Sequence, residues 1–322
     1  MPQNGLLQFL NSPMKPAWIL ALASLCVPLA SAAASDAQYT RMEDVIYGRK
    51  HGMALTMDVF TPAKDANGIG VVLVISGGWF SSHEAIKHFP VTEFVARGYT
   101  VFAVVHGSQP KFTIPEIVAD MHRAVRYIRH HARDYKIDPD RIGVAGGSAG
   151  GHLSLMLGTA GQQGDPDAKD PVARVSSRVQ AVACFYPPTD FLNYGKPEEY
   201  ELGHGVLADY RAPFDFREFD EGQKIFQRIT DEERIREIAR QISPITHVSS
   251  DDPPTLIIHG DADKLVPIQQ AETFLAKLKE AGVPAKLVVR PGAEHGWKDM
   301  RRDWLLLVDW FDKHLKKPPA AP

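Results

Sequence analysis

The chain has 322 residues, of which 44% are hydrophobic, so it is long enough to bury a sizeable core in one or two domains. Its formal net charge of −3, with no block of basic residues, argues against nucleic acid as the main partner. Of its two cysteines, only Cys184 remains once the N-terminal segment is removed, so no internal disulfide is expected in the mature chain.

Residues 1–34 have the pattern of a secretory signal peptide. Lys15 is the only charged side chain among them, and the apolar run AWILALASLCVPLA follows it closely. Small residues come next, and Ala30 and Ala32 fit a small-x-small cleavage rule. The segment is therefore predicted to direct export, to a periplasm or to the outside.

Two other interpretations of this segment are disfavoured. The apolar run is shorter than the roughly 20 residues that a membrane-spanning helix needs, so no stable membrane anchor is expected. Cys26 would be the modified residue of a lipoprotein, but Leu25 before it is too large for that processing. The mature chain is predicted to be a single domain over residues 35–322.

Short apolar and β-branched runs predict eight strands. Two of them open the mature chain around a turn at His51 and Gly52. Several of the others are apolar almost without interruption, as strands covered on both faces must be. The predicted strands cover residues 44–49, 55–60, 70–76, 99–105, 141–146, 179–186, 255–260 and 285–292.

Amphipathic stretches lie between the later strands. Apolar residues at a spacing of three to four predict helices over 113–135, 267–283 and 303–317. Because strands and helices alternate, we expect a mostly parallel sheet with helices on both faces.

A long segment after the sixth strand, residues 191–254, interrupts this alternation and exceeds a plain connection. It is rich in aromatic residues and ends in the charged helical stretch TDEERIREIARQI. One interpretation is a cap over the end of the sheet where catalytic loops gather. The other, of equal weight, is a surface excursion whose aromatic residues fill a small core of their own.

The stretch VAGGSAGG places Ser148 where a predicted strand gives way to a helix. It fits G-x-S-x-G, a turn so tight that side chains at Gly146 and Gly150 would collide with the neighbouring strand and helix. We expect strain at Ser148 to expose its hydroxyl, and the amide of Ala149 to be free to bind an oxyanion. A phosphate-binding turn is excluded because no lysine follows the glycines.

Two further loops supply partners for this hydroxyl. HGDADKLVP places Asp261 and Asp263 just past one predicted strand, and RPGAEHGW places His295 just past the last. The three residues follow one another in the chain in the order serine, acid, histidine, and the loops that carry them meet at one edge of such a sheet. His295 would accept the proton of Ser148, and a buried carboxylate would hold the imidazole in the productive tautomer. Asp263 is the preferred acid, Asp261 is better placed to shape the turn, and Asp190 is the third candidate.

The loop VISGGWFSS provides Gly77 and Gly78 after the third strand, where backbone amides can approach a ligand closely. Trp79 and Phe80, next to this loop, are expected to form a wall of the pocket. The predicted pocket residues are Trp79, Phe80, Tyr186 and Trp297.

No metal or cofactor is implied. His83 and His88 in HEAIKH lie five residues apart, whereas the H-E-x-x-H zinc motif needs a spacing of four. The other histidines show no ligand spacing. The oligomeric state is left open.

The signatures ISGGW, GGSAGG, HGDADKLVP and GAEHGW resemble those of the α/β-hydrolase superfamily. The resemblance is greatest to a bacterial esterase and lipase branch that includes hormone-sensitive-lipase-like carboxylesterases and the feruloyl or acetyl-xylan esterase group. It spans residues 42–316 and implies an eight-stranded, mostly parallel α/β-hydrolase fold with a cap insertion. The functional residues that it implies are the triad Ser148, Asp263 and His295 and the oxyanion-hole residues Gly77, Gly78 and Ala149.

The sequence departs from this branch in its oxyanion loop. The branch usually has H-G-G-G-W, whereas this chain has Ile75-Ser76-Gly77-Gly78-Trp79. The histidine is absent, so either Ser76 or Gly78 could be the partner of Gly77.

The resemblance implies hydrolysis of short acyl esters through an acyl-enzyme, on a small-molecule or polysaccharide-linked substrate. Acetyl or feruloyl esters of plant polysaccharide are candidate substrates. One alternative is a serine peptidase of the prolyl-oligopeptidase kind, for whose usual propeller domain 322 residues leave no room. Another is a non-catalytic binding member of the fold, against which the intact Ser148, Asp263 and His295 argue.

Overall fold

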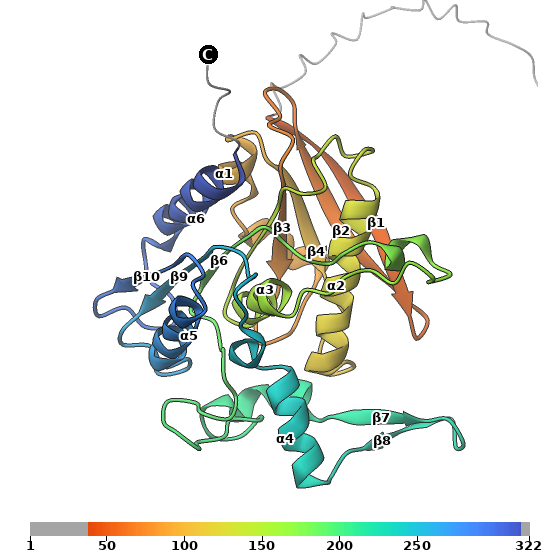
Figure 1. The fold of residues 1–322 in the computed structure, drawn as a ribbon, viewed down its shortest axis with the longest axis vertical. Coiled ribbons are helices and arrows are strands. Elements are labelled where there is room, and N and C mark those ends of the chain that lie inside the picture. Colours follow the sequence, from red (N-terminus) through yellow and green to blue (C-terminus); the bar gives the residue numbers. More distant parts are fainter. Residues whose placement is uncertain (1–37, 317–322) are drawn as a thin grey trace, which may run out of the picture. The chain divides into compact units, whose positions relative to one another are not determined.

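The computed structural model describes residues 38–316, and the predicted signal peptide lies outside them. An eight-stranded sheet has the order β1-β2-β4-β3-β5-β6-β9-β10 (Figure 1). The pairs β1–β2 and β2–β4 are antiparallel and the rest are parallel, which confirms the predicted fold class. The strands are β1 (Tyr39–Lys50), β2 (Met53–Pro62), β3 (Gly70–Ile75), β4 (Thr100–Val105), β5 (Ile142–Gly147), β6 (Ala181–Phe185), β9 (Thr255–Gly260) and β10 (Ala285–Arg290).

β1 begins five residues earlier than predicted. Its first half is largely exposed on the edge of the sheet, and two register shifts interrupt its pairing with β2. A bulge moves the following side chains to the opposite face, so the alternation that reveals a strand is lost there.

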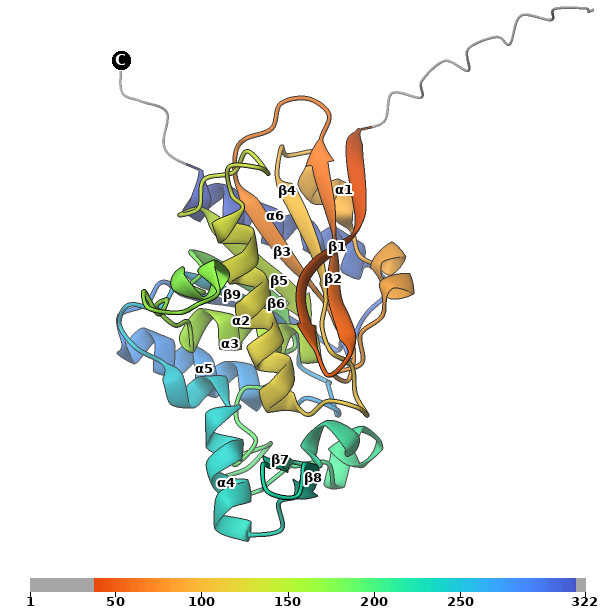
Figure 2. The same ribbon diagram turned by 90° about the vertical axis from the view of Figure 1, so that its right-hand side faces the viewer.

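Helices cover both faces of the sheet (Figure 2). α2, α3 and α5 pack on one face, and α1 and α6 pack on the other. Within residues 38–316, no helix is both long and apolar enough to cross a membrane. The helices are α1 (Val91–Val95), α2 (Ile114–His130), α3 (Ala149–Thr159), α4 (Glu232–Gln241), α5 (Gln269–Glu280) and α6 (Met300–Leu315).

The apolar strands separate two cores. In β3, Val72 and Val74 belong to the core beneath α2 and α3, whereas Val71 and Leu73 belong to the core beneath α1 and α6. All of these side chains are fully buried. Successive side chains of a strand point to opposite faces, which explains why this strand is apolar at every position.

Part of the insertion joins the main core. It contains α4 and a hairpin of β7 (Arg217–Asp220) and β8 (Ile225–Arg228), which lie below the sheet in Figure 1. Two hairpin aromatics, Phe219 and Phe226, are exposed. The buried aromatics of the insertion, which pack in the same core as α2 and α3, are Phe191, Tyr194, Phe214 and Phe216.

Three buried histidines should make the fold sensitive to acid. Burial lowers the pKa of His106, His122 and His152 to about 4 each. Between about pH 6.5 and pH 4 the unfolded chain therefore binds protons that the folded chain excludes, and stability falls as the pH falls, by up to about 3 kcal/mol per histidine. Urea unfolding at several pH values would measure this loss. His122→Gln should make the fall shallower, and an unchanged pH dependence in that variant would contradict the assignment.

Candidate active site

Ser148 occupies a strained turn between β5 and α3. Its φ of 54° and ψ of −122° lie in a region that residues with a Cβ rarely adopt. A Cβ on Gly146 would lie 2.5 Å from the backbone carbonyl of Gly150, and one on Gly150 would lie 3.0 Å from the carbonyl oxygen of Val74. The two outer glycines are therefore required because the helix and the neighbouring strand approach the turn so closely.

Because of this crowding, alanine substitutions at two adjacent glycines should lower the free energy of unfolding by different amounts. Gly146→Ala should lower the free energy of unfolding by about 3 kcal/mol, since backbone atoms must move to accept the new methyl group. Gly147→Ala is the matched control, because its Cβ would meet no atom closer than 3.6 Å. Chemical denaturation of both variants measures the difference. Equal stabilities would mean that the turn is less tightly packed than described.

Ser148, His295 and Asp263 form one hydrogen-bonded chain. Nε2 of His295 lies 2.9 Å from Oγ of Ser148, and Nδ1 lies 2.7 Å from Oδ2 of Asp263. Because an ionised carboxylate only accepts hydrogen bonds, Nδ1 carries the proton, and Nε2 is left to accept the hydroxyl proton of Ser148. The structure thus brings together the three residues that the sequence singled out, from the ends of β5, β9 and β10.

The environment of Asp263 keeps its carboxylate ionised. Burial raises the pKa of Asp263, but hydrogen bonds from His259, His295 and the Val266 amide outweigh this effect and hold the pKa below its usual range. The amides of Leu265 and Val266 both lie 2.9 Å from Oδ1. A carboxylate with this many donors can stabilise the positive charge that His295 acquires when it accepts a proton.

The two competing acids have other partners. Oδ1 of Asp261 accepts a hydrogen bond from the amide of Gly292 at 2.6 Å, which ties together the loops after β9 and β10. Asp190 accepts hydrogen bonds from the backbone and side-chain amides of Asn193 at 3.2 and 2.9 Å. Neither carboxylate contacts His295 within the described part of the chain. Asp261 therefore shapes a turn, as the sequence suggested.

The oxyanion loop offers one free amide rather than two. The Gly77 amide donates to the carbonyl of Phe80 at 3.0 Å, and the Phe80 amide donates back at 2.9 Å. The Gly78 amide has no hydrogen-bond partner in the region that the structure covers, and neither has that of Ala149 at the start of α3. The predicted use of Gly77 as a donor is thereby corrected, since its amide is already engaged. Gly78 has a φ of 54°, and a Cβ there would lie 2.5 Å from the ring of Tyr210.

A pocket of about 530 Å³ lies in front of Ser148. Tyr186, at the end of β6, lines it as predicted, with its ring centroid 4.4 Å from that of His295. Tyr210 also lines it and comes from the insertion, where no sequence signal singled it out. The lining includes Ser76, Gly78, Phe89, Tyr186, Tyr210 and His295.

The other three predicted pocket residues do not line this pocket. Trp79 is buried beneath the loop, where Nε1 donates to Nδ1 of His152 at 3.2 Å. Phe80 is 53% exposed and is not among the residues that line the pocket. Trp297 donates to Oδ2 of Asp303 at 2.7 Å. The prediction assumed that aromatics next to catalytic loops face the substrate, but the indole N–H of Trp79 is held by His152 and that of Trp297 by Asp303.

His152, which accepts the hydrogen bond from Trp79, also contacts the insertion. Its Nε2 donates to the carbonyl of Ile242, at the end of α4, across 2.7 Å. The imidazole is fully buried, and its low pKa keeps it neutral, with one nitrogen donating and the other accepting. One side chain of α3 therefore joins the oxyanion loop to the insertion.

A second serine and histidine pair supports the oxyanion loop. His106, just after β4, has Nδ1 2.9 Å from the carbonyl of Gly107 and Nε2 2.9 Å from Oγ of Ser76. Since a carbonyl only accepts, Nδ1 carries the proton and Nε2 accepts the Ser76 hydroxyl. Sequence reasoning missed this pair, although His106 follows a strand at the same edge of the sheet as His295 does.

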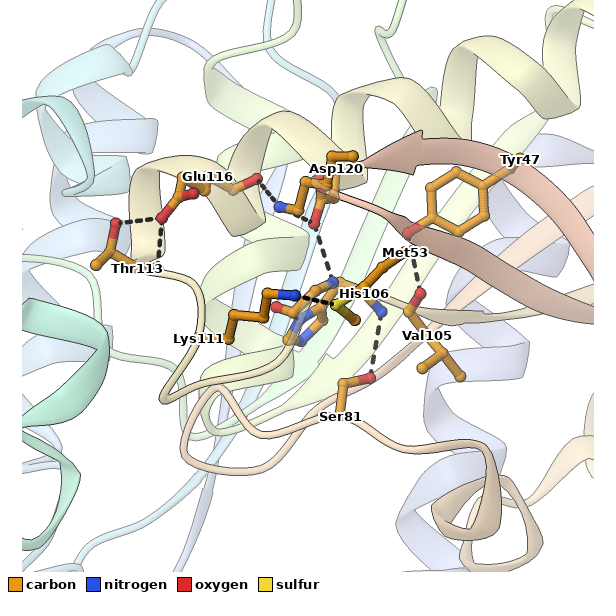
Figure 3. Close-up of polar contacts among 11 residues, drawn as sticks. Tyr47, Met53, Ser81, Val105, His106, Lys111, Thr113, Glu116 and Asp120 are labelled. Atoms are coloured by element: carbon orange, nitrogen blue, oxygen red, sulfur yellow. Dashed lines mark hydrogen bonds and ion pairs between the residues drawn. The ribbon is translucent and has the colours of Figure 1, made fainter. Parts of the chain in front are cut away.

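Further polar contacts hold His106 in place (Figure 3). Oγ of Ser81 donates to the carbonyl of Ile75 at 2.5 Å and accepts the backbone amide of His106 at 3.2 Å. The backbone amide of Gly107 donates to Asp120 at 2.9 Å, and Asp120 forms an ion pair with Lys50 at 2.6 Å. The loop that carries Gly78 is thus anchored to β4, α2 and β1.

Comparisons with known proteins agree with this geometry. The BD-FAE family model matches residues 57–278. The esterase LipC of Mycobacterium tuberculosis is 30% identical over 267 residues, which cover 81% of this chain and 60% of the relative. The probable carboxylic ester hydrolase LipM of the same organism is 29% identical over 80% of this chain and 57% of its own. The chain spans little more than half the length of these curated relatives.

Solved structures show the same fold. A truncated carbohydrate esterase from gut microbiota superimposes with a TM-score of 0.68 at 24% identity, over 88% of this chain and 99% of the other. Butyrate-bound Est2, an esterase of Thermogutta terrifontis, has a TM-score of 0.66 at 25% identity, over 87% and 96%. The chain therefore has the α/β-hydrolase fold and belongs to the BD-FAE family.

Proposed function

We propose that the protein is a serine carboxylesterase that hydrolyses short-chain acyl esters through an acyl-enzyme. The observation that carries this proposal is the hydrogen-bonded chain from Ser148 through His295 to Asp263, at 2.9 and 2.7 Å. An ester carbonyl placed beside Ser148 also meets the free amides of Gly78 and Ala149, which suit a developing oxyanion.

Each step uses groups of this chain. Ser148 attacks the ester carbonyl while His295 accepts the hydroxyl proton, and the oxyanion binds the amides of Gly78 and Ala149. His295 then protonates the departing alcohol as the tetrahedral intermediate collapses to the acyl-enzyme. A water molecule, deprotonated by His295, attacks the acyl-enzyme, and His295 then returns the proton to Oγ of Ser148 as the acid is released. Asp263 stabilises the imidazolium in both halves of the reaction.

The named relatives support ester hydrolysis, and butyrate bound in a solved relative supports a short acyl group. Acetyl or feruloyl esters of plant polysaccharide remain our candidate substrates. A screen of 4-nitrophenyl acetate, butyrate and octanoate together with a feruloyl ester tests the acyl preference. Hydrolysis of aminoacyl 4-nitroanilides but not of esters would instead identify a peptidase. Failure of a fluorophosphonate probe to label the folded protein would indicate a binding protein.

The Ser76 and His106 pair is expected to act on catalysis by positioning the oxyanion loop. Ser76→Ala and His106→Gln should lower kcat by about tenfold to a hundredfold with little change in KM, because a misplaced amide stabilises the transition state poorly. Steady-state kinetics on 4-nitrophenyl butyrate measures this split.

A chemically similar pair elsewhere in the fold provides the control. His122 and Ser177 are buried and lie 2.9 Å apart, Nδ1 to Oγ, away from the pocket. Ser177→Ala and His122→Gln should lower stability without lowering kcat. If both pairs change kcat equally, the effect of Ser76 and His106 is one of general stability rather than of positioning.

We also propose that the protein is exported and that residues 1–34 are removed. The apolar run after Lys15 and the small residues near Ala32 support this. Mass measurement of the protein from the periplasm and medium of a bacterial host tests it. A chain that stays in the cytoplasm and retains Met1 would contradict the proposal.

A further inference from the structure

A second cavity, of about 580 Å³, adjoins the pocket in front of Ser148. We call it the distal cavity. It lies between the edge strand β1, its neighbour β2, residues 86–92 and the start of α6. Four side chains line both this cavity and the active-site pocket, so a substrate longer than one ester group could extend from one into the other. The shared residues are His88, Phe89, Met300 and Trp304.

The charged residues that line the distal cavity are all basic. Arg41 of β1, Lys87 and Arg301 of α6 line it, and within residues 38–316 no aspartate or glutamate lines either cavity. The remaining lining is largely aromatic and aliphatic. This combination suits a ligand with apolar faces and a negative charge.

The cations differ in how far they are already neutralised. Nε of Arg41 donates to the buried carboxylate of Asp58 at 2.8 Å, so its charge is largely satisfied. Arg301 uses only Nε, on Glu93 at 2.8 Å, which leaves both Nη groups without a hydrogen-bond partner in the described part of the chain. Lys87 is exposed and has no ion pair among the same residues. Arg301 and Lys87 are therefore the two groups available to a ligand.

We propose that the distal cavity binds a carboxylate carried by the alcohol portion of the ester substrate. The inference rests on the proposed esterase function and narrows its substrate class to acylated hydroxy acids, such as an acylated sugar acid. The two Nη groups of an arginine match the two oxygens of a carboxylate, and Lys87 adds a second positive charge.

The position of the shared residues points to the alcohol rather than the acyl group. The departing oxygen must lie within hydrogen-bond reach of Nε2 of His295 to receive its proton. Met300 and Trp304 follow His295 in the chain, and the Tyr186 hydroxyl, whose ring packs on His295, lies 3.3 Å from Sδ of Met300. The side of the pocket that leads to the distal cavity is thus the side beside His295.

A matched pair of substrates isolates the effect of the substrate carboxylate on the rate of hydrolysis. Release of acetate is measured from an O-acetylated methyl glucuronoside and from the corresponding glucuronamide, which differ only in carboxylate against carboxamide. The wild-type protein should prefer the acid by about five- to tenfold in kcat/KM, as expected for a charge-assisted contact at an exposed site. Added salt should weaken this preference.

Variants of the protein show which residues cause the preference for the acid substrate. Lys87→Gln and Arg301→Gln should each reduce this preference, because each variant should lower kcat/KM for the acetylated acid more than for the acetylated glucuronamide. Arg302→Gln is the matched control, since Arg302 neighbours Arg301 on α6 and lines neither cavity. Loss of the preference in this control as well would point to overall charge rather than to the distal cavity.

Equal kcat/KM for the acetylated glucuronoside and glucuronamide would overturn the proposal, and so would a preference that persists in both glutamine variants. A preference for 4-nitrophenyl hemiglutarate over 4-nitrophenyl butyrate would also overturn it, because it would place the carboxylate on the acyl side. If even 4-nitrophenyl acetate is not hydrolysed, the proposed function fails instead. Calorimetry with methyl glucuronoside and its amide then tests the distal cavity alone, since binding of the acid only would support it and equal binding would not.

Discussion

Ser148→Ala is expected to lower kcat for 4-nitrophenyl butyrate by about 10⁴-fold or more while the fold persists. The hydroxyl is the atom that Nε2 of His295 contacts at 2.9 Å, and alanine offers no nucleophile in its place. Alanine also has a Cβ, so the strain at a φ of 54° is the same in both proteins. Circular dichroism and thermal unfolding should therefore be nearly unchanged.

The control is a serine of α3, the helix that follows Ser148. Ser154 is buried in α3, and its Oγ donates to the carbonyl of Gly150 at 2.7 Å without contacting His295. Ser154→Ala should retain activity and fluorophosphonate labelling, and Ser148→Ala should lose both. Appreciable turnover in the Ser148 variant would mean that another group is the nucleophile.

Asp263→Asn should be nearly as severe, with a loss of about 10³- to 10⁴-fold in kcat. Asparagine removes the negative charge that stabilises the imidazolium, and its amide group can donate to His295 and favour the wrong tautomer. The backbone amides of Leu265 and Val266 can still bond to Oδ1, so the loop should keep its shape.

Asp261→Asn is the matched comparison, two residues away. Its Oδ1 accepts one hydrogen bond, from the Gly292 amide, and an asparagine oxygen can do the same. Activity should therefore fall only slightly, by less than about fivefold. Steady-state kinetics of the two variants side by side measures the contrast. The reverse order would show that the acid has been wrongly assigned.

Much of the fold could be predicted because its signals are local. Strand β3 is apolar at every position because it is covered on both faces, and the turn at Ser148 needs glycines at positions 146 and 150 for reasons that involve only its neighbours. The triad was also predictable in outline. A hydroxyl, a carboxylate and an imidazole each follow a strand, and parallel strands bring their carboxyl ends to one edge.

The rest depends on contacts between distant segments. The Gly77 amide is occupied because it bonds to the carbonyl of Phe80, and the buried indole of Trp79 donates its N–H to His152. Tyr210 reaches the pocket from an insertion whose path no periodicity reveals. Local patterns identified which loops carry the site residues, but not the direction in which each side chain points.

The buried imidazole of His152 has a consequence for how substrate enters. It joins the indole of Trp79 to the carbonyl of Ile242, so the inner part of the insertion cannot swing outward without exposing a buried hydrogen bond on each side of that ring. We therefore expect the pocket in front of Ser148 to admit dissolved esters without movement of this part of the insertion. The rate of hydrolysis should rise smoothly with ester concentration and show no jump when the ester exceeds its solubility and forms droplets.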